Sequence, residues 1–221
     1  SDLAHELRTP VSNLMTQTQV ALSRTRTSGE YREVLESNAE EFERLSRMIS
    51  DMLFLAKAEN GLIVPGHETF DLADEVAALF DFYGALAEDS GVVLRLEGSG
   101  LVSGDRLMLR RAMGNLLSNA LRYTPKGGEI VVSVRVVDTA GRPVTHLCVE
   151  NTGRPIAPEH LPRLFDRFYR VDASRRHSGD GAGLGLAITR SILRAHGGDI
   201  EVRTGEHSNV FEMWIPLITE M

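Results

Sequence analysis

The stretch AENGLIVPGHE (residues 58–68) divides the chain into two parts with different hydrophobic periods. Its two glycines and single proline favour an irregular linker. Before it, apolar residues recur every three or four positions. After it, helical patterns are mixed with short runs in which apolar and polar residues alternate. The sequence therefore predicts two units, residues 1–60 and 68–221, joined by a linker over residues 61–67.

The first part is predicted to form two helices packed as an antiparallel hairpin. Both helices carry a heptad-like seam, made of Leu3, Leu7, Val11 or Pro10, Leu14, Thr18 and Ala21, and of Leu35, Asn38, Phe42, Leu45, Ile49, Met52 and Ala56. RTRTSGEY (residues 24–31) separates them, and Ser28-Gly29 is expected to mark the turn. A lone hairpin leaves an apolar stripe in water, so we expect a homodimer that forms a four-helix bundle.

The second part is predicted to be an α/β or α+β layer fold with helices on one face of a sheet. Helical patterns cover residues 71–90, 105–123, 158–167 and 183–196. Strand-like alternation is found in VVLRLEG (92–98), EIVVSVRVVD (129–138), THLCVEN (145–151), GGDIEVRT (197–204) and NVFEMWIP (209–216).

Composition narrows the class of protein. The formal charge is -7 over 221 residues, whereas a nucleic-acid surface normally carries a basic stripe. The single cysteine, Cys148, rules out an internal disulfide framework and suits a reducing compartment. Its place in an alternating run predicts a small core residue. No apolar run approaches the roughly 20 residues of a membrane span, so we expect this portion to be soluble.

The opening SDLAHELRTP (residues 1–10) presents one candidate nucleophile, His5. Two helical steps of roughly 100° separate it from Leu3, so the ring is expected to point away from the apolar seam. Neutral imidazole is nucleophilic near pH 7, and the adjacent Glu6 can take its proton. Thr9 lies one turn along, and Pro10 is expected to loosen the helix there. Taken alone, the stretch also fits a surface histidine near a frayed terminus.

A candidate cation site lies in NLLSNALRYTP (residues 115–125). Asn115 and Asn119 are four apart on one helical face, and Arg122 and Tyr123 follow a turn later. Two carboxamide oxygens in line can ligate a hard cation such as Mg²⁺. Two solvated asparagines would give the same pattern.

Two further stretches could meet a nucleotide. In VENTGRPIAPEHLPRLFDRFYR (149–170), the Asn151 amide at a strand end can face a base edge, and Gly153 and Pro155 turn the chain. LFDRFYR (164–170) can anchor itself by its rings and aim Arg167 and Arg170 at phosphate, although ordinary surface arginines are an alternative.

The other stretch is GDGAGLGLAITRSILRAHGG (179–198). Gly181, Gly183 and Gly185 leave bare backbone N–H groups at a helix start, which favours anion binding. The spacing matches neither a Rossmann fingerprint nor a P-loop.

In their order, these stretches resemble a two-component sensor histidine kinase over essentially the whole chain. HELRTP (5–10) is similar to the phospho-acceptor box of that family, and NLLSNALRYTP, VENTGRPI, LFDRFYR and GAGLGLAI (181–188) are similar to its ATP-binding boxes. The resemblance implies a helical hairpin followed by a Bergerat-type α/β sandwich that binds ATP.

The resemblance also implies roles for single residues. His5 would receive the γ-phosphoryl group of ATP with Glu6 as base, and Thr9 would position water for dephosphorylation of a response regulator. Asn119 would hold Mg²⁺ with support from Asn115. The implied nucleotide set is completed by Arg122, Tyr123, Lys126, Asn151, Gly153, Pro155, Ile156, Arg167, Arg170, Gly181, Ala182, Gly183, Leu184, Gly185 and Leu186, of which residues 181–185 would form the hinge of a lid.

Within the family, residues 1–22 and 149–172 look most like heavy-metal sensors of the copper and silver type. Asn151 and Pro155 stand where most histidine kinases have an aspartate and a glycine, and the metal-sensor subgroup resembles this sequence at both positions. The uncharged amide of Asn151 can still accept a hydrogen bond from adenine, with a modest loss of affinity.

The resemblance implies a homodimer, a response-regulator receiver domain as partner and a membrane-anchored parent with this portion in the cytoplasm. Two alternatives stay open. One is an ATP-gated scaffold that docks a receiver domain and mainly dephosphorylates it. The other is a plain hydrolytic ATPase, although Asn115 stands where gyrase and MutL have a water-activating glutamate.

Overall fold

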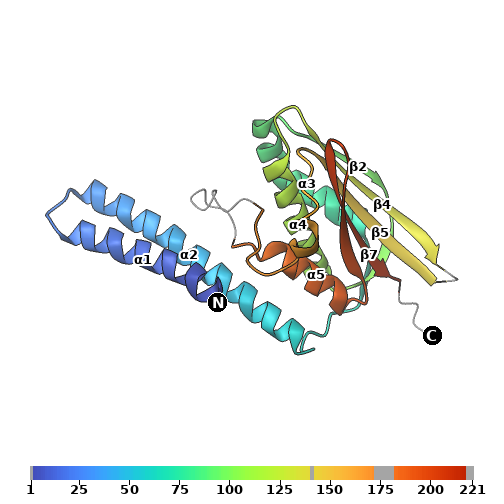
Figure 1. The fold of residues 1–221 in the computed structure, drawn as a ribbon, viewed down its shortest axis with the longest axis horizontal. Coiled ribbons are helices and arrows are strands. Elements are labelled where there is room, and N and C mark those ends of the chain that lie inside the picture. Colours follow the sequence, from blue (N-terminus) through green and yellow to red (C-terminus); the bar gives the residue numbers. More distant parts are fainter. Residues whose placement is uncertain (1, 140–141, 172–181, 218–221) are drawn as a thin grey trace.

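The computed structural model describes residues 2–139, 142–171 and 182–217. An extended helical hairpin leads into an α/β layer structure, and the second helix of the hairpin runs alongside that structure (Figure 1).

The hairpin consists of α1 (Asp2–Leu22) and α2 (Ser28–Glu59). A capping box starts α2, because the Thr27 hydroxyl accepts from the Glu30 N–H while the Glu30 carboxylate accepts from the Thr27 N–H. The prediction that Ser28-Gly29 forms the turn is therefore wrong. Both residues are already helical, and the chain reverses just before Thr27.

The seam of the hairpin is only partly covered within one chain. Pro10, Leu14 and Ala21 are buried on α1, whereas Val11 is 44% exposed, so Pro10 occupies the seam position. On α2 the seam positions Leu35, Phe42 and Ile49 are 67%, 61% and 49% exposed. One side of the hairpin thus remains apolar and open to solvent.

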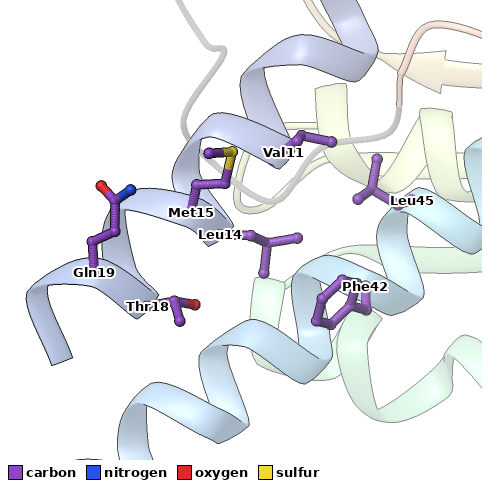
Figure 2. A pocket seen from close by; sticks show the side chains of 7 residues that line it. All are labelled: Val11, Leu14, Met15, Thr18, Gln19, Phe42 and Leu45. Atoms are coloured by element: carbon purple, nitrogen blue, oxygen red, sulfur yellow. The ribbon is translucent and has the colours of Figure 1, made fainter. Parts of the chain in front are cut away.

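A groove of about 360 Å³ lies on this open side. Figure 2 shows Leu14 of α1 pointing toward Phe42 and Leu45 of α2 across it. Its remaining lining comes from Val11, Met15, Thr18 and Gln19.

The second part contains a five-stranded sheet in the order β2-β4-β5-β7-β6 and a separate β1–β3 pair. β2 pairs in parallel with β4, and the other pairs are antiparallel. The strands are β1 (Glu68–Asp71), β2 (Val93–Gly98), β3 (Leu101–Gly104), β4 (Glu129–Thr139), β5 (Arg142–Thr152), β6 (Asp199–Thr204) and β7 (Ser208–Pro216).

Helices α3 (Leu72–Ser90), α4 (Arg106–Tyr123) and α5 (Gly185–Ala195) cover one face of the sheet (Figure 1). Asp71 and Asp105 cap α3 and α4 by accepting from Ala73 N–H and Met108 N–H. The core lies between these helices and the inward side chains of β4, β5 and β7. The predicted combination of a helical hairpin with an α/β layer fold is confirmed.

Three details differ from the sequence prediction. The helix expected over residues 158–167 is only a short 3-10 turn, Leu161–Arg163. The strands β1 and β3 were not predicted. Cys148 lies on the outer face of the sheet and is half-exposed, because Leu147 and Val149 take the inward positions of β5. Its prediction as a core residue is wrong.

Among the described residues, no helix combines the length and apolar character that a membrane span requires.

Candidate functional site

The side chain of Asn115 joins α4 to the start of α5. Its Nδ2 donates to the carbonyl oxygen of Gly185 at 3.0 Å and lies 3.4 Å from the hydroxyl oxygen of Thr189. Because the amide nitrogen is used in this way, the Oδ1 atom is the part of Asn115 left to face a ligand. Asn119 lies one turn further along the same face of α4 and is half-buried.

A tight backbone contact precedes α5. Gly183 has φ +71°, a conformation that favours glycine, and its carbonyl oxygen accepts from Phe168 N–H at 3.0 Å. A Cβ on Gly183 would lie 3.0 Å from the carbonyl carbon of Phe168. Phe168 itself has φ 61°. This contact brings the LFDRFYR segment and the glycine-rich stretch together.

The start of α5 presents backbone donors. Leu184 is the N-cap residue, and its side chain makes no capping hydrogen bond. The first N–H groups of α5 therefore have no side-chain cap, which makes the helix start suited to an anion. Leu184 is buried, and Ala182, Gly185 and Leu186 are half-buried. Gly181 lies outside the described residues.

A second group of predicted residues meets at the end of β5. Asn151 is 3% exposed and its Nδ2 donates to the carbonyl oxygen of Thr152, which leaves Oδ1 as an acceptor. A Cβ on Gly153 would lie 2.9 Å from the carbonyl oxygen of Tyr123, so glycine permits this close approach. Ile156 N–H donates to Asn209 Oδ1 at 3.0 Å.

Arg167 lies at the edge of the second part, and it forms an ion pair with Glu59 near the end of α2. Arg170 follows it on the same segment and is half-buried. The segment is anchored as predicted by its rings, because Phe165 and Phe168 pack against the core.

The other predicted residues of the second part are exposed at its surface. The stem of Lys126 packs over Gly91 in the turn before β2. Arg122, Tyr123 and Pro155 are exposed. On α1, Glu6 is half-buried and Thr9 is exposed, whereas the His5 side chain lies outside the described residues.

Two residues of the site were missed by sequence reasoning. Asn209 is 4% exposed, and its Nδ2 donates to Arg154 O while its Oδ1 accepts from Ile156 N–H, so it holds the loop after β5. Thr189 is fully buried, and its hydroxyl lies within hydrogen-bonding distance of the Gly185 and Ala112 carbonyl oxygens. For Asn209 and Thr189, the signal in the sequence that could have indicated these roles is a polar residue within an otherwise apolar run.

Two family models match the chain. Residues 1–61 match the His Kinase A (phospho-acceptor) domain, and residues 104–219 match the histidine kinase-, DNA gyrase B-, and HSP90-like ATPase family.

The chain belongs to the sensor histidine kinase family.

Similar proteins agree with this assignment. The sensor histidine kinase CusS of Escherichia coli (strain K12) is 54% identical to this chain over 217 residues, which are 98% of the chain and 44% of CusS. The sensor protein CopS of Pseudomonas syringae pv. tomato is 50% identical over 184 residues, 83% of the chain and 37% of CopS. The chain thus spans less than half the length of these relatives.

A solved structure shares the architecture of nearly the whole chain. The histidine kinase AdeS of Acinetobacter baumannii superposes with a TM-score of 0.77 at 25% identity, covering 97% of this chain and 98% of that one. The predicted family and fold are therefore confirmed.

Proposed function

We propose that this chain is a protein-histidine kinase core that transfers the γ-phosphoryl group of ATP to His5. The observation that carries the proposal is the contact of Asn115 with Gly185, which sets two carboxamides beside the open start of α5. The same chain holds the phospho-acceptor helix α1. Residues 1–60 serve as the dimerisation and phospho-acceptor unit, residues 61–67 as linker and residues 68–221 as the ATP-binding unit.

The residues beside α5 fit a nucleotide in chemical type. The α5 start and the cations Arg122, Arg167 and Arg170 suit phosphate oxygens, whereas Lys126 would have to leave its place over Gly91 to join them. Asn151 Oδ1, at a buried strand end, suits the amino group of adenine, and Tyr123 and Ile156 lie beside the loop that follows.

The carboxamide pair fits Mg²⁺. Asn119 would provide an oxygen ligand and Asn115 would support it through Oδ1, since its Nδ2 is held by Gly185. Bound with Mg²⁺, ATP supplies the phosphoryl group and the cation neutralises charge on the phosphate oxygens.

The nucleophile comes from α1. One nitrogen of a neutral His5 ring would form the new bond to the γ-phosphorus as the bond from that phosphorus to the β–γ bridging oxygen breaks and ADP leaves. Glu6, next to His5 in the same helical turn, would take the proton of the other ring nitrogen. Thr9, one turn further along α1, acts in the opposite reaction, in which it positions a water molecule for dephosphorylation of a response regulator. Because an amide cannot activate water as a carboxylate can, Asn115 leaves transfer to His5 preferred over hydrolysis.

A second copy of the chain is the proposed partner of the hairpin. Leu35, Phe42 and Ile49 repeat along one exposed stripe of α2, and the groove of Figure 2 opens on the same hairpin. Covering this stripe in a four-helix bundle would remove apolar surface from water.

The proposed signalling role is metal-responsive, with a response-regulator receiver domain as the phosphoryl acceptor. Its support is the resemblance of residues 1–22 and 149–172 to heavy-metal sensors, together with the similarity to CusS and CopS. The parent is proposed to be anchored in the inner membrane with this portion in the cytoplasm, in line with relatives more than twice its length.

One assay tests the proposed activity. Incubation with labelled ATP and Mg²⁺ is expected to yield acid-labile, base-stable phosphoprotein, because phosphohistidine has that stability. His5→Gln and removal of Mg²⁺ with a chelator should each abolish the label. Full labelling of His5→Gln would contradict the proposal. Nucleotide binding without any labelled protein would favour the ATP-gated scaffold, and phosphate release independent of His5 would favour a hydrolytic ATPase.

A further inference from the structure

The last three turns of α2 pack directly on the second part of the chain. Met48 and Leu55, one heptad apart, are 3% and 2% exposed and continuous with its hydrophobic core. α2 also contacts α5, whose start is the proposed phosphate site (Figure 1). We name this face of α2, made of Met48, Asp51, Phe54, Leu55 and Glu59, the docking strip.

Two arginines of the second part form ion pairs with the docking strip. Arg111 of α4 forms an ion pair with Asp51, and its guanidinium lies 4.9 Å from the ring centroid of Phe54. Arg111 is therefore held by two side chains of α2, by the carboxylate of Asp51 through an ion pair and by the ring face of Phe54 through a cation–π contact. Arg167 forms the second ion pair, with Glu59.

Both arginines adjoin the proposed nucleotide site. Arg111 lies four residues before Asn115, so it occupies the preceding turn on the same face of α4. Arg167 is one of the cations assigned above to phosphate. The docking strip thus contacts the site at two edges, through α4 and through the segment next to Gly183.

We propose that the docking strip of α2 and the nucleotide compete for the second part of the chain, with Arg167 as the shared residue. This inference rests on the proposed function. A guanidinium that pairs with the Glu59 carboxylate has fewer donors left for phosphate. Because docking lowers the fraction of protein that is competent to bind, the apparent nucleotide affinity is proportional to the undocked fraction. Nucleotide must in turn weaken docking to the same extent.

Calorimetric titration with a non-hydrolysable ATP analogue tests the competition. Glu59→Gln is expected to tighten binding by about 1.5- to 5-fold, the range that one exposed ion pair accounts for. Asp51→Lys faces Arg111 with a like charge and should tighten binding at least as much, although Asp51 belongs to α2 and not to the nucleotide site. The matched control is Glu43→Lys, the same charge change at an exposed residue about two turns earlier on α2.

Restoring the pair provides the decisive comparison. The double variant Asp51→Arg with Arg111→Asp keeps the net charge of the wild type and restores the ion pair, although not the contact of Arg111 with Phe54, so it should return the affinity toward the wild-type value. Glu43→Lys, which carries the same charge change as Asp51→Lys without facing Arg111, should leave the affinity unchanged. In the wild type, the analogue should also speed amide hydrogen exchange over residues 48–59.

Two results separate this inference from the proposed function. A wild type that binds the analogue with the same affinity as Glu59→Gln and Asp51→Lys overturns the competition alone. A wild type that binds no nucleotide overturns the proposed function and the competition with it.

Discussion

The Nδ2 atom of Asn115 lies 3.0 Å from the carbonyl oxygen of Gly185, so a single side chain fastens the proposed Mg²⁺ helix α4 to the proposed phosphate helix α5. Thr189, one turn into α5 and fully buried, adds a second contact across this junction, because its hydroxyl lies within hydrogen-bonding distance of the Ala112 carbonyl oxygen of α4. The Asn115 carboxamide therefore contributes to the relative placement of the two proposed ligand sites.

Replacing Asn115 by Ala should weaken both folding and nucleotide binding. Loss of the hydrogen bond to Gly185 is expected to lower the free energy of unfolding by about 0.5–1.5 kcal/mol. Urea titration measures the first effect and calorimetry with an ATP analogue the second. The exposed Asn13 on α1 offers a control, since Asn13→Ala should change the unfolding free energy by less than about 0.5 kcal/mol. An Asn115→Ala protein as stable as that control would show that the junction contributes nothing.

Gly183→Ala should distort the entry to α5. The residue has φ +71°, and the new methyl group would lie 3.0 Å from the Phe168 carbonyl carbon. The left-handed backbone alone costs about 1–2 kcal/mol for an L-residue. A lower urea midpoint and weaker binding of the ATP analogue are the expected results.

Gly84→Ala is the matched control for this substitution. Gly84 lies inside α3, where a Cβ would meet nothing within 4 Å, so the change should raise stability by about 0.5–1 kcal/mol. Equal effects of the two alanine substitutions would mean that the contact of Gly183 with Phe168 is unimportant.

His196 should make stability depend on pH. It is 5% exposed, its Nε2 accepts from Asp105 N–H at 3.0 Å, and its Nδ1 donates to Ile192 O at 2.8 Å. Burial lowers the pKa of His196 below its ordinary value of 6.5. The folded state thus prefers the neutral ring.

The contribution of the neutral His196 ring to the free energy of unfolding is therefore complete above about pH 6.5. It is lost as the pH falls toward the lower pKa of His196 in the folded state, by at most about 1.4 kcal/mol per pH unit. Urea titrations between pH 7.5 and pH 5 measure this slope. His196→Gln should reduce the pH dependence of the unfolding free energy near pH 6 relative to the wild type. An unchanged slope would assign the pH dependence to other groups.

Much of the fold could be predicted because its long elements repeat clearly. α3, α4 and α5 follow the helical period, and the five strands of the sheet alternate over at least six residues. The four residues of β1 and of β3 are too few for such a pattern. The false helix over residues 158–167 includes Pro158 and Pro162, and proline interrupts helical hydrogen bonding.

The site was predictable only where a stretch of sequence carries its own chemistry. The glycines, Asn115 and Asn119 stand in recognisable runs, whereas Asn209 acts across the sheet through partners more than 50 residues away. The docking strip was not predicted from the sequence for another reason. Met48 and Leu55 are seven residues apart, as are Leu35, Phe42 and Ile49. The hydrophobic period therefore does not distinguish the face of α2 that packs on the second part from the face that is exposed to solvent.

The most direct measurement is to locate the phosphoryl group after incubation with Mg²⁺ and ATP. Peptide mapping by tandem mass spectrometry, kept at alkaline pH to preserve phosphohistidine, should find one added phosphoryl group in the peptide that contains His5. It should find none in peptides with His67, His146, His160, His177, His196 or His207. A phosphoryl group on any residue other than His5, or an unmodified His5 peptide from protein that has bound ATP, would contradict the account.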